Sequence, residues 1–189
     1  KLNRINVFPV ADGDTGSNMS MTISSVEKEL TKVDEKSSMN EVSEAVEEAI
    51  LMGARGNSGT ILSQIITGFL KGIGDKDRLY AADVVTALES AKEVAYKAVN
   101  QPVEGTILTV IRKVAESARE YVKTSDDLVG LLENIKDTAQ EAVEQPPEEL
   151  PKLKEAGVVD AGAKGLFYIL EGFYMLITQA DLVEEIEAT

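Results

Sequence analysis

The sequence of 189 residues contains no cysteine, no tryptophan and no histidine. Without cysteine, the chain can form neither a disulfide framework nor a cysteine-ligated zinc site. Without histidine, it has no imidazole that could serve as a general base or as a metal ligand. Any metal ion must therefore bind through oxygen atoms, and any catalysis must use other groups.

Basic residues are also scarce. The chain has 19 Lys and Arg against 33 Asp and Glu, which gives a formal net charge of −14. Because nucleic acid backbones are held by Lys and Arg, this balance argues against a nucleic acid partner. A nucleotide is a different case, since divalent ions can lie between its phosphates and acidic side chains.

Long apolar runs are missing as well. None approaches the ~20 residues of a membrane span, and the N-terminus lacks the features of a signal peptide, so we expect a cytoplasmic protein. A hydrophobic content of 43% suits one well-buried core, and residues 1–189 are predicted to form a single domain. Since the first residue is not Met, we expect the sequence to be a fragment of a longer protein.

Helical periodicity dominates the residues that are present. Apolar residues recur at intervals of three and four, as in the stripe formed by Val42, Ala45, Val46, Ala49 and Ile50. Similar patterns predict helices over 17–33, 61–70, 84–98, 107–121, 128–142 and 166–177. The strand-like runs at 5–10 and 158–159 are too few to make a sheet. The sequence therefore predicts an all-α fold of about seven helices.

Two kinds of connection separate the predicted helices. Plain polar turns lie at 34–38, 74–78 and 124–126. Four connections of less ordinary composition lie at 12–16, 53–59, 100–106 and 145–165. The two kinds alternate along the chain, and alternate connections of an up-and-down bundle share an end. The four unusual connections should therefore meet and form a polar rim around an apolar interior.

The turn at Asp12-Gly13-Asp14 is a candidate metal site. Two carboxylates one residue apart repel each other unless a cation lies between them, and Mg²⁺ is a cation that prefers oxygen ligands. The alternative is a hydrophilic turn that caps a helix. An EF-hand does not fit, because its sixth position would be Ser17 instead of glycine and its twelfth Ile23 instead of glutamate.

The segment 53–60 is rich in glycine and joins two apolar helices. Its backbone N–H groups lie at the start of a helix, where phosphate oxygens bind, although a glycine C-cap followed by a serine N-cap is an alternative. It is not a Walker A loop, because no lysine follows at the required place. Segments 102–108 and 157–165 are weaker candidates, since Thr106 and Asp160 could be helix caps only.

Four segments together carry a resemblance to a known family. They are residues 6–19, 53–64, 104–110 and 157–166, which include Val-Ala-Asp-Gly-Asp-Thr-Gly and Gly-Ala-Arg-Gly-Asn-Ser-Gly. With these motifs, in the family's order and spacing, the chain resembles the nucleotide domain of the bacterial fatty acid kinase catalytic subunit. That domain is similar in turn to the L subunit of dihydroxyacetone kinase. The resemblance spans nearly the whole chain.

The resemblance implies an antiparallel up-and-down helical barrel that holds Mg-ATP or Mg-ADP at its open end. A further helix of the family would precede Lys1. The resemblance also implies site residues. Asp12 and Asp14 match the ligands of Mg²⁺, of which two ions are expected, and they are the catalytic candidates. Asn6 falls near a third ligand position, with an apparent shift of one residue and an amide in place of a carboxylate. The nucleotide-binding candidates are Thr15, Gly16, Asn18, Gly56, Asn57, Ser58, Gly59, Thr106, Ile107, Asp160 and Gly162.

The implied reaction transfers the γ-phosphate of ATP to the carboxylate of a fatty acid, which a separate binding protein presents. A carboxylate is already ionised at neutral pH, so the reaction needs no general base and the absence of histidine is no obstacle. Two alternatives stay open, a dihydroxyacetone kinase L-type subunit and a non-catalytic acidic helical domain that contacts partner proteins. Arg55 is either a loop cation that offsets the acidic surface or a phosphate contact.

Overall fold

The computed structural model describes the chain except for residues 35, 146–149 and 188–189, and it leaves the side chains of 180–187 undescribed. The described part contains eight α-helices, one 3-10 helix and no strand. The elements are η1 (Leu2–Ile5), α1 (Thr15–Leu30), α2 (Met39–Gly53), α3 (Gly56–Ile73), α4 (Ala81–Lys97), α5 (Ile107–Tyr121), α6 (Leu128–Glu144), α7 (Pro151–Ala156) and α8 (Ala161–Glu187). The predicted all-α class is therefore confirmed.

Seven of the eight α-helices correspond to the predicted ones, and the short helix α7 was not predicted. It has six residues, too few to show a helical repeat of apolar positions. Its ends nevertheless follow known rules. Pro151 occupies the start of the helix, and Gly157 ends it with a left-handed φ of 62°.

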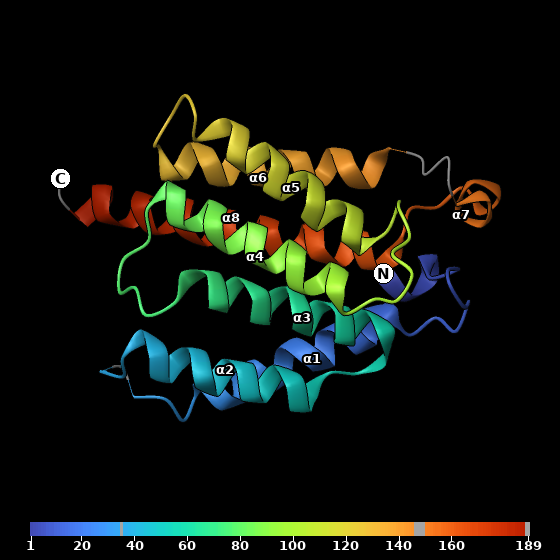
Figure 1. The fold of residues 1–189 in the computed structure, drawn as a ribbon, viewed down its shortest axis with the longest axis horizontal. Helices are drawn as coiled ribbons and strands as arrows, with labels where there is room; N and C mark the ends of the chain where they lie inside the picture. Colours follow the sequence, from blue (N-terminus) through green and yellow to red (C-terminus); the bar gives the residue numbers. More distant parts are fainter. Residues whose placement is uncertain (35, 146–149, 188–189) are drawn as a thin grey trace.

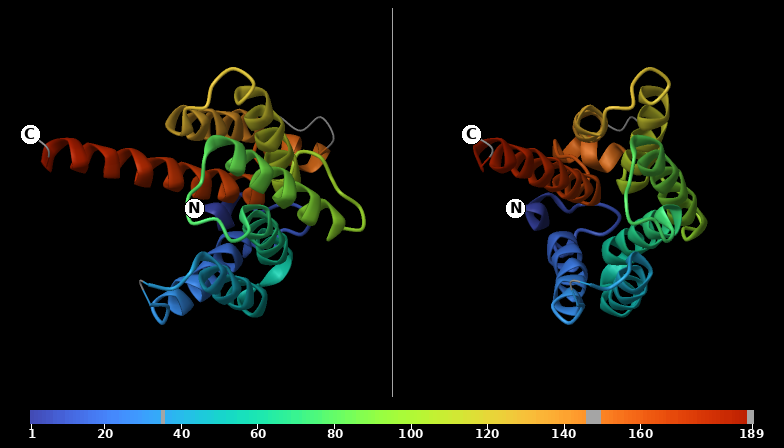
Figure 2. Two further views of the ribbon diagram at one scale, coloured as in Figure 1. Left: turned by 60° about the vertical axis from the view of Figure 1, so that its left-hand side comes forward. Right: turned by 90° about the vertical axis from the view of Figure 1, so that its left-hand side faces the viewer.

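The long helices lie side by side and follow one another around a circuit (Figures 1 and 2). The most extensive contacts join α3 to α4, and α8 closes the circuit by contacting α6, α5 and α1. The interior is filled mainly by aliphatic side chains, of which the largest fully buried ones are Ile50, Leu62, Leu108, Ile111, Leu131 and Leu153. No described helix combines the length and the apolar character that crossing a membrane requires.

Helices α3 and α4 touch through their backbones. A Cβ atom at Gly68 would lie 2.7 Å from the Cα of Ala91, and one at Gly72 would lie 2.4 Å from the Cα of Ala87. This antiparallel register continues toward the start of α3 and the end of α4. The close contact therefore brings the first turn of α3 next to the segment that follows α4.

Helices α1, α3, α5 and α8 all begin at the same end of the bundle, the right-hand end in Figure 1, and α2, α4 and α6 begin at the other end. We call the first the pocket end and the second the far end. The connections that the sequence distinguishes by their composition lie at the pocket end. Their expected convergence is therefore observed.

Candidate functional site

A pocket of about 480 Å³ lies at the pocket end. It draws its walls from all four of the unusual connections and from the helices that begin there. Most of the predicted site residues line it, namely Asn6, Asp12, Asp14, Thr15, Asn18, Gly56, Asn57, Ser58, Thr106, Ile107, Asp160 and Gly162. Residues distant in the sequence are thus brought together around one cavity.

Gly16 and Gly59 are the two predicted site residues that do not line the pocket. A Cβ atom at Gly16 would lie 2.7 Å from Oδ1 of Asn3, and one at Gly59 would lie 2.4 Å from Oγ1 of Thr22. Both glycines therefore allow close packing around α1. They shape the pocket through the placement of α1 and do not form its surface.

Asp12 and Asp14 are exposed residues that line the pocket. Asp14 occupies the N-cap position of α1, but its side chain does not cap the helix. Within the described part of the chain, neither carboxylate accepts a hydrogen bond or pairs with a cation, and no group of three or more acidic residues is placed to hold a metal ion. Gly13 permits the turn between them with a φ of 68°. The two carboxylates therefore remain available to a cation.

The side chain of Asn6 braces the loop that carries these aspartates. It is only 5% exposed. Its Oδ1 accepts hydrogen bonds from the backbone N–H groups of Asp14 (3.1 Å) and Thr15 (3.2 Å). Its Nδ2 donates to the carbonyl oxygens of Phe8 (3.4 Å) and Val10 (3.2 Å). The amide therefore joins both halves of the loop and caps α1.

Ligation of a metal ion by Asn6 would require Oδ1 to give up at least one of these hydrogen bonds. The bracing role was not predicted from the sequence. One signal was present there, because an amide stands where a carboxylate ligand is expected. An amide can both donate and accept hydrogen bonds, whereas an ionised carboxylate only accepts them.

Asn3 provides a second cap for α1. Its Oδ1 accepts from the backbone N–H of Ser17 (3.1 Å), and its Nδ2 donates to Oγ of Ser17 (2.8 Å). The start of α1 is therefore closed by two side-chain amides, both from residues that precede the helix.

The start of α3 is different, because no side chain caps it. Among the described residues, the backbone N–H groups of Gly56, Asn57 and Ser58 have no hydrogen-bond acceptor, while that of Gly59 donates to the carbonyl oxygen of Arg55. Gly56, Asn57 and Ser58 all line the pocket. Free N–H groups at the positive end of the helix dipole attract anions. The start of α3 is thus the part of the pocket best suited to a phosphate group.

Arg55 lies beside this helix start, but its side chain forms hydrogen bonds at the end of α2. Its Nη1 donates to the carbonyl oxygens of Met52 (3.1 Å) and Ala54 (2.9 Å), and its backbone N–H donates to Oγ1 of Thr22 (3.2 Å). The guanidinium therefore closes the end of α2, and Arg55 is not among the residues that line the pocket. This arrangement agrees with the interpretation of Arg55 as a loop cation.

Asp160 lies where the starts of α5 and α8 meet. Its carboxylate accepts a hydrogen bond from the backbone N–H of Ala163 (2.8 Å), and the backbone N–H groups of Gly162 and Ile107 also favour its ionised form. Burial raises the pKa of the Asp160 carboxyl from its ordinary 3.8 to about 6, although these hydrogen bonds oppose the effect. Thr106 also caps α5, since its Oγ1 accepts from the N–H of Leu108 at 3.4 Å. Both residues act as helix caps and line the pocket as well.

The rest of the pocket surface is largely apolar. It is formed by Phe8 from the loop of residues 6–14 (the aspartate loop), Ile61 from α3, Val99 and Val103 from the α4–α5 connection, and Leu108 from α5. The pocket therefore combines available carboxylates, a helix start open to anions and an apolar wall. This combination suits a ligand with an anionic part and an apolar part, accompanied by a divalent cation.

Comparison with known proteins agrees with the sequence motifs. Residues 9–175 match the model of the DAK2 domain family. The chain is 44% identical over 172 residues to protein YloV of Bacillus subtilis (strain 168), and 42% identical over 172 residues to an uncharacterized protein of Staphylococcus epidermidis. An uncharacterized protein of Staphylococcus aureus (strain USA300) is 43% identical over 176 residues. Each match covers 91% of this chain but 31% of the relative, so the chain spans about a third of the length of these relatives.

Proposed function

The chain belongs to the DAK2 domain family, a kinase-related family that resembles the L subunit of dihydroxyacetone kinase, and on this premise we propose that it binds ATP or ADP together with Mg²⁺. The phosphates would bind at the start of α3, and the metal would bind at Asp12 and Asp14. The apolar wall of the pocket would receive the rest of the nucleotide.

One observation carries this proposal. The uncapped start of α3 lies in the same pocket as two carboxylates that have no partner among the described residues. The N–H groups of a helix start attract phosphate, while carboxylates repel it unless a divalent cation lies between them. A polyphosphate with a bound divalent cation satisfies both parts of the pocket at once.

The donor set fits Mg²⁺. Asp12 and Asp14 offer carboxylate oxygens, and the described residues contain no larger cluster of ligands that would form an all-protein cage. Mg²⁺ commonly binds through one or two carboxylates, with water and phosphate oxygens as its other ligands. When bound, it would neutralise charge on the transferring phosphates. The chain itself would hold the metal through Asp12 and Asp14, on a loop that Asn6 fixes in place. We propose two ions, as the resemblance implies.

We further propose that the acceptor is the carboxylate of a fatty acid presented by a separate binding protein. A bond forms between a carboxylate oxygen and the γ-phosphorus, the bond from this phosphorus to the β-γ bridging oxygen breaks, and ADP leaves. The resemblance of the four motifs supports this choice. The lack of histidine is compatible with it, because an ionised carboxylate has no proton to remove.

Calorimetry with ADP in the presence and absence of MgCl2 tests the nucleotide site. The chain offers a matched control, because Asp75 and Asp77 are also exposed aspartates one residue apart, in the α3–α4 connection at the far end. We expect the affinity of the double variant Asp12→Ala/Asp14→Ala for ADP in the presence of Mg²⁺ to fall at least 100-fold. The double variant Asp75→Ala/Asp77→Ala, with the same change in charge, should bind as the wild type does. Equal behaviour of both variants would contradict the proposed metal site.

A thermal shift assay separates a nucleotide-binding domain from an acidic interaction domain. A ligand at 100 times its Kd stabilises the folded state by about 2.7 kcal/mol. Mg-ADP should therefore raise Tm, and a purely structural helical domain would show no such increase.

The acceptor is tested separately, with the domain inside its full-length polypeptide and with γ-labelled ATP. The label should pass to a fatty acid carried by its binding protein and not to dihydroxyacetone. Labelling of dihydroxyacetone would support an L-type subunit instead. Failure of both acceptors in a protein that binds Mg-ADP would remove the proposed reaction but not the nucleotide site.

A further inference from the structure

The α4–α5 connection, residues 98–106, supplies much of the pocket wall through Val99, Asn100, Gln101 and Val103. It contains no helix or strand, so no repeating backbone hydrogen bonds hold it in place. We infer that Glu104 is the positioning residue that fixes this wall and thereby sets the affinity for the nucleotide. The inference rests on the proposed function and concerns a residue that does not itself line the pocket.

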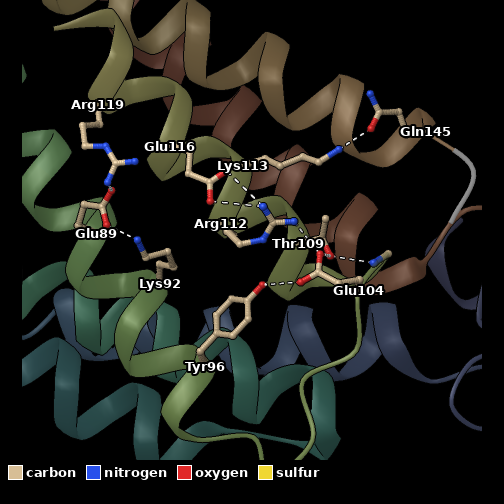
Figure 3. A network of polar contacts seen from close by, with 11 residues as sticks. Glu89, Lys92, Tyr96, Glu104, Thr109, Arg112, Lys113, Glu116, Arg119 and Gln145 are labelled. Carbon is tan, nitrogen blue, oxygen red and sulfur yellow. Dashed lines mark hydrogen bonds and ion pairs between the residues drawn. The ribbon is translucent and has the colours of Figure 1, made fainter. Parts of the chain in front are cut away.

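The carboxylate of Glu104 accepts three side-chain hydrogen bonds (Figure 3). They come from the hydroxyl of Tyr96 (3.1 Å), Oγ1 of Thr109 (2.8 Å) and Nη2 of Arg112 (2.7 Å). Tyr96 lies in the last turn of α4, while Thr109 and Arg112 belong to α5. One side chain of the connection is therefore anchored to both of the helices that it joins.

Thr109 extends this anchor into the backbone. Its Oγ1 donates to Glu104 and accepts from the backbone N–H of Gly105 at 2.7 Å. Next in the chain, Oγ1 of Thr106 donates to the carbonyl oxygen of Val103 at 2.7 Å. Hydrogen bonds thus fix the connection from Val103 to the first turn of α5, and Val103 and Thr106 both face the pocket.

The charge of Glu104 strengthens these contacts. Burial alone would raise the pKa of the Glu104 carboxyl, but the hydrogen bonds from Arg112, Thr109 and Tyr96 outweigh burial and hold the pKa below its ordinary value. The carboxylate is therefore ionised at neutral pH. Hydrogen bonds to an ionised acceptor are about twice as strong as those between neutral groups.

Arg112 provides a matched control, because its guanidinium pairs with two carboxylates. Nη2 contacts Glu104 at 2.7 Å, and Nη1 contacts Glu116 at 3.2 Å, one turn further along α5. The two glutamate side chains are similarly exposed, at 37% and 44%. Glu104→Gln and Glu116→Gln thus each remove one carboxylate charge that pairs with the same guanidinium, but only Glu104 belongs to the connection that forms the pocket wall.

Calorimetry should distinguish the two variants. We expect Glu104→Gln to weaken binding of Mg-ADP about tenfold, and Glu116→Gln to leave it within about twofold of the wild type. Magnesium pyrophosphate lacks the part of the nucleotide that would contact the connection, so its affinity should not change in either variant. A general loss of structure would weaken the binding of both Mg-ADP and magnesium pyrophosphate. A loss for Mg-ADP alone is therefore specific to a positioning role.

Hydrogen exchange gives a readout that needs no ligand. Backbone amides of residues 98–106 should exchange faster in Glu104→Gln than in Glu116→Gln, with the amides of α1 and α2 unchanged. Tyr96→Phe removes one of the three hydrogen bonds and keeps the charge, so it should show a smaller effect, about threefold on Mg-ADP affinity. It serves in place of Glu104→Gln if that variant does not fold.

Three outcomes would overturn the inference. These are equal Mg-ADP affinities in the two glutamine variants, equal exchange in the connection, or an equal loss of Mg-ADP and pyrophosphate in Glu104→Gln. A wild-type protein that binds no Mg-ADP contradicts the proposed function instead, and the exchange comparison alone then decides whether Glu104 fixes the connection.

Discussion

The two ends of the bundle begin their helices in different ways. At the far end, each cap comes from a residue within three positions of the groups that it serves. Ser38 and Glu41 form a capping box on α2, Asp83 accepts from the N–H of Tyr80, and Asp127 accepts from those of Val129 and Gly130. At the pocket end, α5 and α8 have local caps from Thr106 and Asp160, but the caps of α1 reach across 8 to 14 positions and α3 has no side-chain cap.

This difference separates what folding requires from what a site requires. Local caps form wherever the helix forms, and each is worth about 1 kcal/mol. A cap that comes from another part of the chain exists only once the tertiary structure has assembled. The start of α3 lacks the stabilisation that a serine or aspartate side chain at position 55 could supply as a cap. The pocket end therefore gives up local capping at α1 and α3, and five substitutions test the contrast between the two ends.

Asn6→Ala should have the largest effect, because the amide makes four hydrogen bonds to backbone groups. Their loss leaves backbone groups near the buried side chain without partners, and we expect the free energy of unfolding to fall by about 3 kcal/mol. Binding of Mg-ADP should fall as well. Chemical denaturation and calorimetry measure the two effects.

Asn6→Asp separates a brace from a metal ligand. A carboxylate can still accept from Asp14 and Thr15, but it cannot donate to Phe8 and Val10. If Asn6 acts as a brace, this variant binds Mg-ADP more weakly than the wild type. Tighter binding of Mg²⁺ would instead identify position 6 as a ligand.

Asp160→Asn should change how stability depends on pH. Because burial raises the pKa of Asp160 to about 6, the folded state holds the proton between about pH 4 and 6, where the unfolded state has already released it. This carboxyl therefore lowers the stability of the wild type as pH rises through that window. The stability of Asp160→Asn relative to the wild type should rise by about 2 kcal/mol between pH 4 and 7.

Denaturant unfolding of both proteins across this pH range gives the difference directly, since the other titrating groups are common to the two. The difference should level off above about pH 6.5. A difference that stays constant with pH would show that burial does not perturb Asp160.

Gly56→Ala tests the open start of α3. The φ of Gly56 is 59°, and a Cβ atom there would lie 2.3 Å from Nδ2 of Asn18. A left-handed conformation costs a residue with a Cβ atom about 1 to 2 kcal/mol, so we expect a loss of stability of that size. Because the free N–H groups would shift, Mg-ADP affinity should also fall, by about tenfold. An unchanged affinity would separate the start of α3 from the phosphate site.

Asp127→Ala should have the smallest effect and serves as the far-end counterpart. It removes the acceptor of two N–H groups in the first turn of α6, which should lower stability by about 1 kcal/mol. Mg-ADP affinity should not change. An effect on binding as large as that of Gly56→Ala would erase the distinction between the two ends.

The sequence predicted the features that depend on nearby residues. The apolar repeats located the seven long helices, and the alternation of connection types predicted that the distinctive segments would meet at one end. Asp12 and Asp14 were recognised as a pair because a single residue, Gly13, separates them in the chain.

The features that escaped prediction depend on contacts across the fold. The amide of Asn6 reaches groups of α1, and this partnership exists only in three dimensions. The same holds for the group formed by Glu104, Tyr96 and Arg112. Four long helices, α1, α3, α5 and α8, begin at the pocket end, and only the structure shows that α3 alone among these four lacks a side-chain cap in the described chain.

The backbone contact between α3 and α4 has a mechanical consequence. At Gly68 and Gly72 no layer of side chains separates the two backbones, so the helices cannot slide past each other by changes of side-chain conformation. The two helices should therefore move as one rigid unit. The anion-binding turn of α3 belongs to this unit. If the pocket closes around a ligand, the parts that move should then be the aspartate loop and the α4–α5 connection, while the start of α3 stays in place.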